Sequence, residues 1–372
     1  MTVLRRIGLA LAAPALALAF SLVVTTLVLL ASNTSPLDDL QQMLDYASRP
    51  RTQALILNSA TTYYFAAVAV ASGFRMNLFN IGVDGQYRLA AMLAASLGGW
   101  LTLSPILHVG VILIAAVAVG ALWAALAAFL KVTRGVSEVI STIMLNYIAT
   151  GIIGYLLAPG RLAVATAGSN NIGTRPIPAS GQVPGLDLVS GSPLKVYGLV
   201  VLAVAVGLGY WFLLSRTRFG FDLRATGANE PAAVASGVSV RRMVIVSMLL
   251  SGGVAGLIGM PQLLGSSYTY ALDFPVGLGF TGIAIALLGR NHPVGIAFGA
   301  LLWGFLDNSV TILQLAGVAK EVVFITEGVI VLSVVVAYEI VRRYRVRAEQ
   351  QAVGRELGRT TPDPAATEGA PA

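Results

Sequence analysis

The stretch ILHVGVILIAAVAVGALWAALAAFL, residues 106–130, contains no charged side chain. At about 1.5 Å of rise per residue, a helix of this length crosses the hydrocarbon core of a bilayer, which is about 30 Å thick. A helix is the expected form, because it satisfies its own backbone hydrogen bonds in lipid. The whole chain shares this character, since it is 56% hydrophobic and 11% charged, with a mean hydropathy of +0.80. This composition is far from that of soluble domains and predicts a membrane protein.

Further apolar runs lie on both sides of this stretch, and together they predict an all-α, polytopic membrane protein with about ten transmembrane helices. The first run follows Arg5 and Arg6 as a signal peptide would, but it is about twice the usual length, so we predict a retained anchor. We assign residues 1–346 to one transmembrane domain and the polar residues 347–372 to a disordered tail. The predicted spans are 8–31, 53–72, 82–103, 106–130, 137–158, 195–214, 243–263, 274–290, 293–314 and 320–341.

The Lys and Arg residues are distributed unequally between alternate loops. With the N-terminus inside, the inner segments carry most of them, and the outer segments carry few. An excess of basic residues marks the cytoplasmic loops of membrane proteins, so we predict that both termini are cytoplasmic. The basic residues of the outer segments are Arg49, Arg51, Arg161, Arg175, Lys195 and Lys320.

The motifs of several enzyme classes are missing from the sequence. No Gly-Lys dipeptide occurs, so there is no phosphate-binding P-loop and the chain cannot hydrolyse ATP by itself. No HExxH motif and no GxSxG elbow with a plausible triad are found. Cysteine is absent and only His108 and His292 are present, too few for a histidine-rich metal cluster. We predict that the chain is not an enzyme and has no catalytic residue, metal site or cofactor of its own.

A basic segment between two spans, SRTRFGFDLRATGANEPAAVASGVSVRR (215–242), contains the pattern of a very short helix. Asn229 can cap its N-terminus, and Pro231 is tolerated in its first turn. Gly237 can end it in the left-handed conformation. The small residues between them suit docking into a groove on a cytoplasmic partner, and an ordinary connector remains the alternative. The largest outer segment, residues 159–194, is either a platform for an external partner or a disordered connector.

Two glycine-interrupted patches, FNIGVDGQYRLAA (79–91) and FPVGLGFTGIAIA (274–286), each begin an apolar run. They fall in the third and eighth predicted spans, which are comparable places in two halves of the chain, so we predict two related halves. Interrupted helices often lie near the substrate path of transporters, because unwound backbone supplies donors and acceptors. Close helix packing at the glycines is the alternative explanation.

The sequence resembles a known family of membrane permeases. GVSEVISTIMLNYIA (135–149), FNIGVDGQ (79–86), SGGVAGLIGMPQLLG (251–265) and GFTGIAIALLGRNHPVGI (279–296) look like the signatures of ABC importer permeases of the simple-sugar and nucleoside branch, related to the ribose and branched-chain amino acid permeases. The resemblance covers residues from about 55 to 335. The 215–242 segment resembles the family's coupling loop, and the matching residues are Gly227, Asn229, Ala232, Ala233 and Gly237. The family's proline and the residue after it are exchanged here, as Glu230 and Pro231.

The resemblance implies that the chain is the permease subunit of an ATP-driven importer in a bacterial plasma membrane, most simply for nucleosides. It implies three protein partners: an ATP-binding subunit that holds ATP and Mg²⁺, a second and paralogous permease, and an extracytoplasmic solute-binding lipoprotein. No nucleic acid is implied as a partner. The helix near 229–236 would couple the permease to the ATPase.

Polar and aromatic residues within the predicted spans are candidates for the solute pathway, because polar groups are costly in lipid and a nucleoside needs hydrogen-bond partners and a flat apolar surface. Asp84 and Arg88 are also spaced to pair on one helix face. The pathway candidates are Asn58, Asp84, Asn146, Tyr147, Phe280, Asp307, Asn308 and Glu327.

Two alternatives remain open from the sequence. The same machine could carry a simple sugar or an amino acid, in which case only the solute differs. An ion-coupled secondary carrier would instead use Asp84, Asp307 and Glu327 as coupling sites, and it would have no use for a docking helix.

Overall fold

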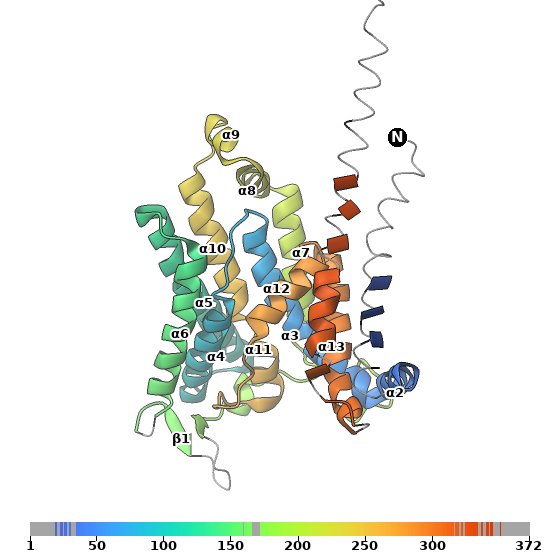
Figure 1. Ribbon diagram of the computed structural model, residues 1–372. Coiled ribbons are helices and arrows are strands. Elements are labelled where there is room, and N and C mark those ends of the chain that lie inside the picture. The colour runs from blue at the N-terminus through green and yellow to red at the C-terminus, as the bar shows by residue number, and fades with distance from the viewer. Residues whose placement is uncertain are drawn as a thin grey trace, which may run out of the picture. The chain divides into compact units, whose positions relative to one another are not determined.

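The computed structural model describes residues 35–158, 160–165 and 172–315, with scattered residues between 19 and 30 and between 317 and 350 (Figure 1). The chain divides into two compact units: residues 37–317 form one, and residues 1–36 with 318–372 form the other. The predicted first span, 8–31, and the predicted tail, 347–372, lie almost entirely outside the described residues. The bundle described below belongs to the unit of residues 37–317.

Helices make up most of the described chain. The one sheet among the described residues is a pair of short antiparallel strands, β1 (Ala163–Ala165) and β2 (Ile172–Thr174), in the predicted outer segment. The helices are α2 (Pro36–Ser48), α3 (Pro50–Phe74), α4 (Val83–Trp100), α5 (Pro105–Arg134), α6 (Glu138–Leu156), η1 (Ala179–Gly181), α7 (Val200–Arg216), α8 (Arg218–Ala228), α9 (Glu230–Ala235), α10 (Val240–Gly256), α11 (Met260–Gln262), the π-turn η2 (Leu263–Ser267), α12 (Leu278–Leu288) and α13 (Pro293–Leu315).

Among the described residues, five helical segments are long and apolar enough to cross a membrane, or six if α7 and α8 count as one bent span. The prediction of a multi-pass helical membrane protein is therefore confirmed. Two further predicted spans, at 274–290 and 320–341, contain shorter apolar helices, α12 and Phe324–Ser333. The predicted total of about ten spans thus includes segments that are half-length or lie outside the described residues, and it stays a prediction.

Helix α3 forms the centre of the bundle. It packs against α7, α10, α12 and α13, and 72% of its apolar window is buried. Small side chains allow this, since the run from Ala66 to Ala71 is completely buried and alternates mostly between Ala and Val. Helices α5 and α10 approach even more closely, because Gly120 faces the backbone of Gly252 and Gly256 faces that of Ala116. Membrane helices use small residues in this way to bring their backbones into contact.

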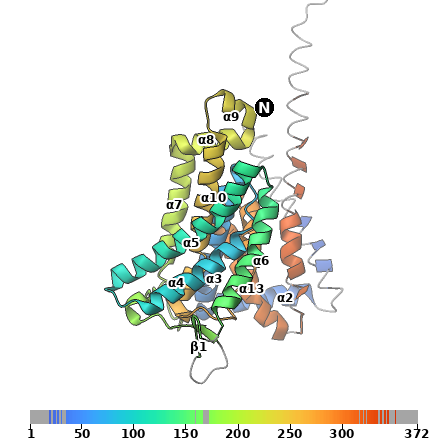
Figure 2. The same ribbon diagram turned by 90° about the vertical axis from the view of Figure 1, so that its left-hand side faces the viewer.

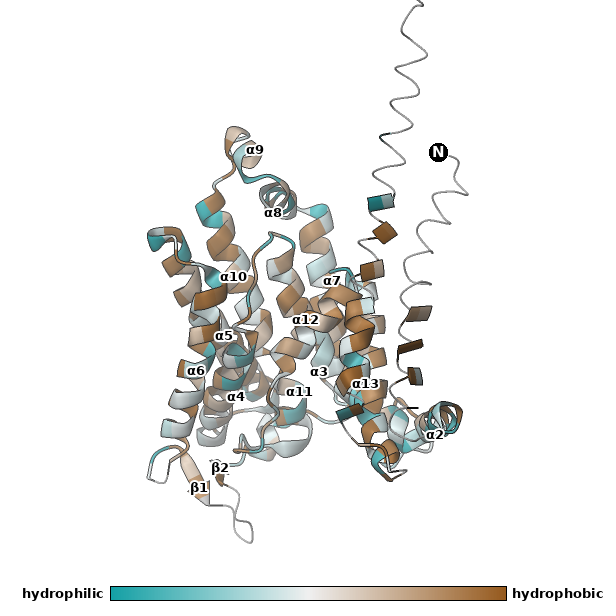
Figure 3. Ribbon diagram, viewed as in Figure 1, coloured by the Kyte–Doolittle hydropathy of each residue, from teal (hydrophilic) through white to brown (hydrophobic). Residues whose placement is uncertain are grey.

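One end of the bundle is basic, and it carries α8 and α9 (Figure 2). Helices α3, α5 and α7 finish at this end, and α6, α10 and α13 start from it. Figure 3 shows hydrophobic residues along α10, α12 and α13 and hydrophilic residues at the helix ends beside α8 and α9. Lys131 and Arg134 in the last turn of α5, Arg216 in that of α7, and Arg241 and Arg242 in the first turn of α10 supply the charge.

Candidate functional site

Helices α8 and α9 form a short projection at the basic end of the bundle. The chain bends by 74° between α7 and α8, so that α8 lies across the end of the bundle (Figure 2). Helix α9 follows after Asn229, and the chain then returns into the membrane-spanning α10. The projection is therefore held by a long helix on each side.

The short helix α9 is defined at both ends by its own sequence. The Asn229 side chain accepts a hydrogen bond from the Ala232 N–H at 3.1 Å, which caps the N-terminus. At the other end Gly237 is left-handed, with φ of +82°. Its N–H donates to the Val234 carbonyl at 2.9 Å and the Val238 N–H donates to the Ala233 carbonyl at 3.0 Å, which is the Schellman arrangement. The predicted short helix and both of its caps are confirmed.

Helix α8, which the sequence analysis took as part of a loop, is anchored to the bundle by backbone contacts. Thr217 caps it by accepting from the Gly220 N–H at 3.1 Å, and Arg224 donates to the Leu214 carbonyl. At its far end Gly227 faces the turn after α3, where an added Cβ would stand 2.7 Å from the Arg75 carbonyl oxygen and 2.9 Å from the Met76 Cα. The projection is therefore in direct contact with the end of the central helix α3.

The exposed surface of this projection is small and apolar. Pro231, Ala232 and Ala235 are exposed, and Val234 is 58% exposed. Ala233 differs from them, because it is only 2% exposed and packs inward. Of the residues matched to the coupling-loop pattern, Ala232 thus faces solvent, while Ala233 and Gly227 support the helix. Arginines 218, 241 and 242 are exposed around this apolar tip.

A second feature is a pair of interrupted helices, α4 and α12, whose N-termini meet inside the bundle. Each helix starts four residues after a phenylalanine, Phe79 or Phe274, and each is capped by a glycine, Gly82 or Gly277. A Cβ added at Gly279, in the first turn of α12, would stand 2.6 Å from the Asp84 nitrogen, in the first turn of α4. The two glycine-interrupted patches of the sequence are therefore in contact, although Gly82 is right-handed, with φ of −73°, and Gly277 is left-handed, with φ of +88°.

The Asp84 carboxylate lies at this junction. It accepts a hydrogen bond from the Gly277 N–H at 2.7 Å and another from Gly279, so it caps α12 from a different helix. A carboxylate is stabilised at a helix N-terminus by the free N–H groups and the helix dipole. The predicted pairing with Arg88 is confirmed as a long contact of 3.8 Å. Asp84 therefore joins the two interrupted helices.

Other polar side chains hold the irregular segment before α4. Asn146 on α6 accepts from the Gly85 N–H at 2.8 Å and donates to the Ile81 carbonyl at 2.9 Å. Asn80 donates to Gln86 at 2.9 Å and to Ser251 at 2.8 Å. The two Asn146 bonds satisfy backbone groups that would otherwise be unpaired in the membrane.

The remaining pathway candidates are dispersed. Asn58 is buried and clamps the outer segment to α3, donating to the Lys195 carbonyl at 3.1 Å and accepting from the Tyr197 N–H at 2.7 Å. Asn308 donates to Ser59 at 3.1 Å, and its neighbour Asp307 hydrogen-bonds Tyr63, so this pair joins α13 to α3. Glu327 is half-buried in the helix Phe324–Ser333, which belongs to the other unit.

Two of the candidates, Tyr147 and Phe280, project from the bundle. Tyr147 on α6 is 76% exposed and Phe280 on α12 is 54% exposed. Near Tyr147, Arg88 on α4 donates to Thr150, one turn beyond Tyr147, at 3.0 Å. The sequence analysis paired Arg88 with Asp84 and did not place it among the pathway candidates, although it is an ionisable residue inside a predicted span.

An ion pair at the basic end of the bundle was not predicted from the sequence. Glu138 pairs with Lys131 at 2.6 Å, and not with the nearby Arg134. One Glu138 oxygen also accepts from the Phe79 N–H at 3.5 Å. Glu138 thus fixes the loop between α5 and α6 to the interrupted segment before α4.

The described helices thus form a membrane-embedded bundle with a short, capped helix at its basic end. The chain belongs to the family described as branched-chain amino acid transport system / permease component, whose model matches residues 53–337. It is therefore an ABC transporter permease, and ATP hydrolysis belongs to another component.

Individual relatives extend this assignment. The chain is 36% identical over 286 residues to the guanosine ABC transporter permease protein NupP of Bacillus subtilis, covering 76% of this chain and 81% of that protein. It is 30% identical over 348 residues to the glucose ABC transporter permease protein TsgB13 of Haloferax volcanii, covering 91% and 90%. It is 28% identical over 267 residues to a second guanosine permease of Bacillus subtilis, NupQ, covering 67% and 78%.

Proposed function

We propose that this chain is the permease of a nucleoside importer. The observation that carries the choice of solute is the 36% identity to a guanosine permease over 76% of the chain. The wider class of ABC importer permease rests on the family itself. The family gives no support to an ion-coupled carrier.

The basic end of the bundle is the cytoplasmic end in this proposal. Its arginines and lysines follow the distribution of the positive-inside rule, and the projection of α8 and α9 lies there. The chain is then a multi-pass protein of a bacterial plasma membrane, with residues 1–346 as its membrane domain, residues 347–372 as a cytoplasmic tail and both termini inside. Ten spans in two related halves belong to the same proposal, and a glycine at the N-cap of both α4 and α12 supports them.

Helix α9 is the element of the permease that the ATPase contacts and moves. Its exposed apolar tip presents Pro231, Ala232 and Val234, and the partner's surface would receive them. Its rigid caps keep the six residues helical when they are pushed. The contact of Gly227 with the turn after α3 then carries the displacement to the centre of the bundle. ATP and Mg²⁺ are bound by the ATPase subunit.

Two further partners complete the importer. A second permease, different from this chain, forms the other wall of the pathway, as the presence of two guanosine permeases among the relatives suggests. A solute-binding lipoprotein delivers the nucleoside at the outer end. The exposed Tyr147 on α6, with the nearby Arg88 and Thr150, would face the solute, since it offers a flat ring beside hydrogen-bonding groups.

A sugar is the second candidate solute, because a glucose permease matches a larger part of the chain, 91%, at 30% identity. The test is uptake by proteoliposomes that contain the complete importer, purified from its own operon. ATP-dependent accumulation of labelled guanosine, competed by unlabelled nucleosides and not by glucose, is the expected result. Accumulation of glucose alone would replace the nucleoside by the sugar, and uptake driven by an ion gradient without ATP would overturn the proposal.

A further inference from the structure

An apolar groove runs along the outside of the bundle between α7 and α13. Helix α3 forms its floor, with Tyr64 packed against Gly207 of α7. The walls carry Val204 and Leu208 from α7 and Phe298 from α13, and Phe298 is 70% exposed. The cavity has a volume of about 710 Å³. In a membrane this groove faces lipid or another membrane-embedded segment.

The length of the groove matches one leaflet of a bilayer. Along α7 its lining extends from Val200 to Trp211, which at about 1.5 Å per residue is roughly 16 Å. The hydrocarbon core of a bilayer is about 30 Å thick, so one leaflet accounts for roughly half of it. A spanning helix from another chain would need a groove about twice as long, whereas one acyl chain needs only this length.

The charge at the two ends of the groove is unequal. At the basic end His292 belongs to the lining and is exposed, and Arg216 lies over the ring of the lining residue Trp211, 5.6 Å from its centroid. Arg290 is exposed two residues before His292. The lining residues, all of them described, include no carboxylate. The groove therefore offers an apolar channel with Arg216 and Arg290 near its basic end, whereas Lys195, near its other end, is paired with Asp187 at 3.2 Å.

The same end is closed by polar contacts that fix its shape. The Tyr210 hydroxyl donates to the Asn291 carbonyl at 3.0 Å, and Arg75 donates to the same oxygen at 2.7 Å. The His292 ring nitrogen Nδ1 accepts from the Val294 N–H at 3.3 Å. These contacts hold α7 and α13 at a set distance where the groove meets the interface, so that an anionic group there would lie near Arg216 and Arg290 and would accept from the other nitrogen of the His292 ring.

We propose that the groove binds an acyl chain of an anionic phospholipid from the leaflet at the basic end, with the lipid phosphate beside His292 and Arg216. The apolar lining would exclude the head group, and the cations would select a negatively charged one, since basic residues near the interface attract anionic lipid. The proposal rests on the proposed orientation only where it calls that leaflet cytoplasmic. It does not depend on which solute the importer carries. A bound lipid would fill the gap between α7, which leads into α8 and α9, and α13.

Fluorescence of Trp211 tests the proposal in the full-length protein. The chain is reconstituted at equal mole fractions of brominated phosphatidylglycerol or brominated phosphatidylcholine, and the signal of a Trp211→Phe variant is subtracted to isolate Trp211. We expect stronger quenching by the anionic lipid. Equal quenching by the two lipids, or none by either, would overturn the proposal.

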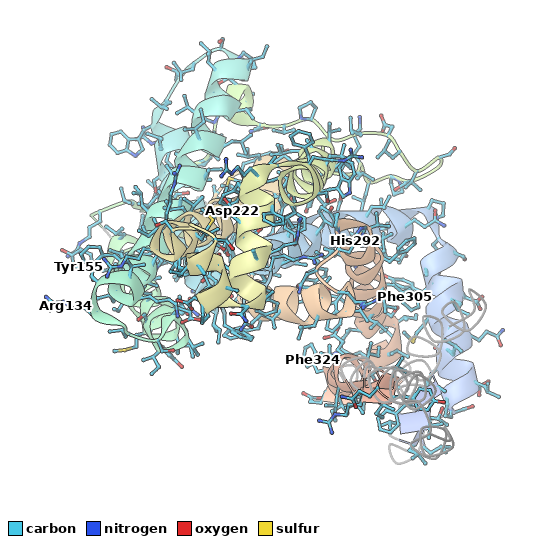
Figure 4. The ribbon with its side chains drawn as sticks, turned by 90° about the horizontal axis from the view of Figure 1, so that it is seen from above. Arg134, Tyr155, Asp222, His292, Phe305 and Phe324 are labelled. Atoms are coloured by element: carbon cyan, nitrogen blue, oxygen red, sulfur yellow. The ribbon has the colours of Figure 1, made fainter. Side chains whose placement is uncertain are left out.

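Variants that remove polar or charged side chains show which residues select the anionic lipid. His292→Ala with Arg216→Gln should abolish the preference for phosphatidylglycerol, and each change alone should weaken its retention about fivefold in native mass spectrometry. Arg134→Gln is the matched control, because Arg134 belongs to the same end but lies on the opposite side of the bundle from His292 (Figure 4). A preference that survives the double change, or that is lost equally in the control, would contradict the site.

A third variant separates lipid from a protein occupant. Val204→Phe narrows the groove without changing its charge, and it should reduce both quenching and lipid retention. Val204→Cys places the only cysteine of the chain in the groove wall, where a bromo-lipid should protect it from a maleimide. A crosslink from this cysteine to residues 8–31 or to the second permease would show a protein occupant and would refute the proposal. None of these measurements requires transport. A result that refutes the lipid site would therefore leave the proposed importer function unaffected.

Discussion

Gly227 and Met76 lie so close together that a Cβ on Gly227 would stand 2.9 Å from the Met76 Cα. The two residues are far apart in the sequence, and their contact joins the end of α8 to the turn after α3. Because α3 packs against four other helices of the bundle, a displacement of the projection reaches the core by this route. Gly227 thus has a structural explanation, which is the close approach of two backbones.

Gly227→Ala should therefore damage both folding and transport. The added methyl group meets backbone atoms, which cannot move aside as a side chain could, and overpacking of this kind typically costs about 1–3 kcal/mol. We expect a lower unfolding midpoint and uptake reduced several-fold. Gly209→Ala on α7 is the control, since nothing lies within 4 Å of a Cβ there. Equal behaviour of the two variants would show that the contact is unimportant.

Removal of the Asn229 cap should loosen α9 without unfolding the bundle. Asn229→Ala leaves the Ala232 N–H without its partner, at a cost of about 1 kcal/mol, while Asn229→Asp keeps an acceptor. The measurement is hydrogen exchange of the amides of residues 232–235, which should become faster in the alanine variant only. ATPase stimulation by the loaded binding protein should fall in the same variant. An unchanged exchange rate in Asn229→Ala would show that the Asn229 cap does not stabilise α9.

A charge on the exposed tip of α9 should uncouple the importer. Val234→Asp and Ala232→Asp place an anion on the surface that the ATPase is proposed to contact, whereas the buried Ala233 is left in place. We expect normal amounts of protein in the membrane and uptake close to background. Thr133→Asp, exposed in the last turn of α5 at the same end, is the control. Uptake at the wild-type rate in both tip variants would argue against docking.

Asp84 should prove to be a structural joint and not a contact for the solute. Asp84→Ala leaves the Gly277 N–H unpaired, which costs about 1–3 kcal/mol, whereas Asp84→Asn retains an acceptor of the same size. The unfolding midpoint should fall for alanine and largely recover for asparagine, and uptake should follow it. A stable Asp84→Asn protein that transports nothing would instead indicate that the Asp84 carboxylate contacts the solute.

The comparison of sequence and structure separates local from long-range information. The start and end of α9 could be predicted because Asn229, Pro231 and Gly237 act within a few residues. Helix α8 was missed because its glycines, Gly220 and Gly227, look like helix breakers until the neighbouring backbone is known. Capping of α8 by Thr217 follows the ordinary preference for threonine, but the stability of the helix comes from its packing.

The candidate pathway residues show the limit of reasoning from polarity alone. Asp84, Asn58 and Asn146 are buried or half-buried polar groups in predicted spans, and each is occupied with backbone atoms far away in the sequence. No spacing rule relates Asp84 to Gly277, because the two are 193 positions apart. Exposed aromatic residues such as Tyr147 could be identified in the sequence as span residues, but their exposure depends on the packing of the bundle.

The outer segment illustrates the same point. Residues 159–194 have the composition of a connector, yet the described part contains β2 and η1 and is fixed to the bundle. His108, which is completely buried in α5, bonds Ser180 at 2.8 Å and the Gly98 carbonyl at 2.9 Å. The Ala163–Ala165 strand pairs with β2, and Gly173 is bridged to Ala271. Tertiary contacts therefore order a segment whose own residues favour turns.

The central claim, that the ATPase acts on α9, is tested most directly by crosslinking in the complete importer. The chain contains no cysteine, so Ala232→Cys introduces a single reactive site at the exposed tip. With a short photoactivatable thiol reagent, we predict a crosslink to the ATP-binding subunit whose yield changes on addition of ATP. A crosslink to the external binding protein, or a cysteine labelled only from outside the membrane, would contradict the account.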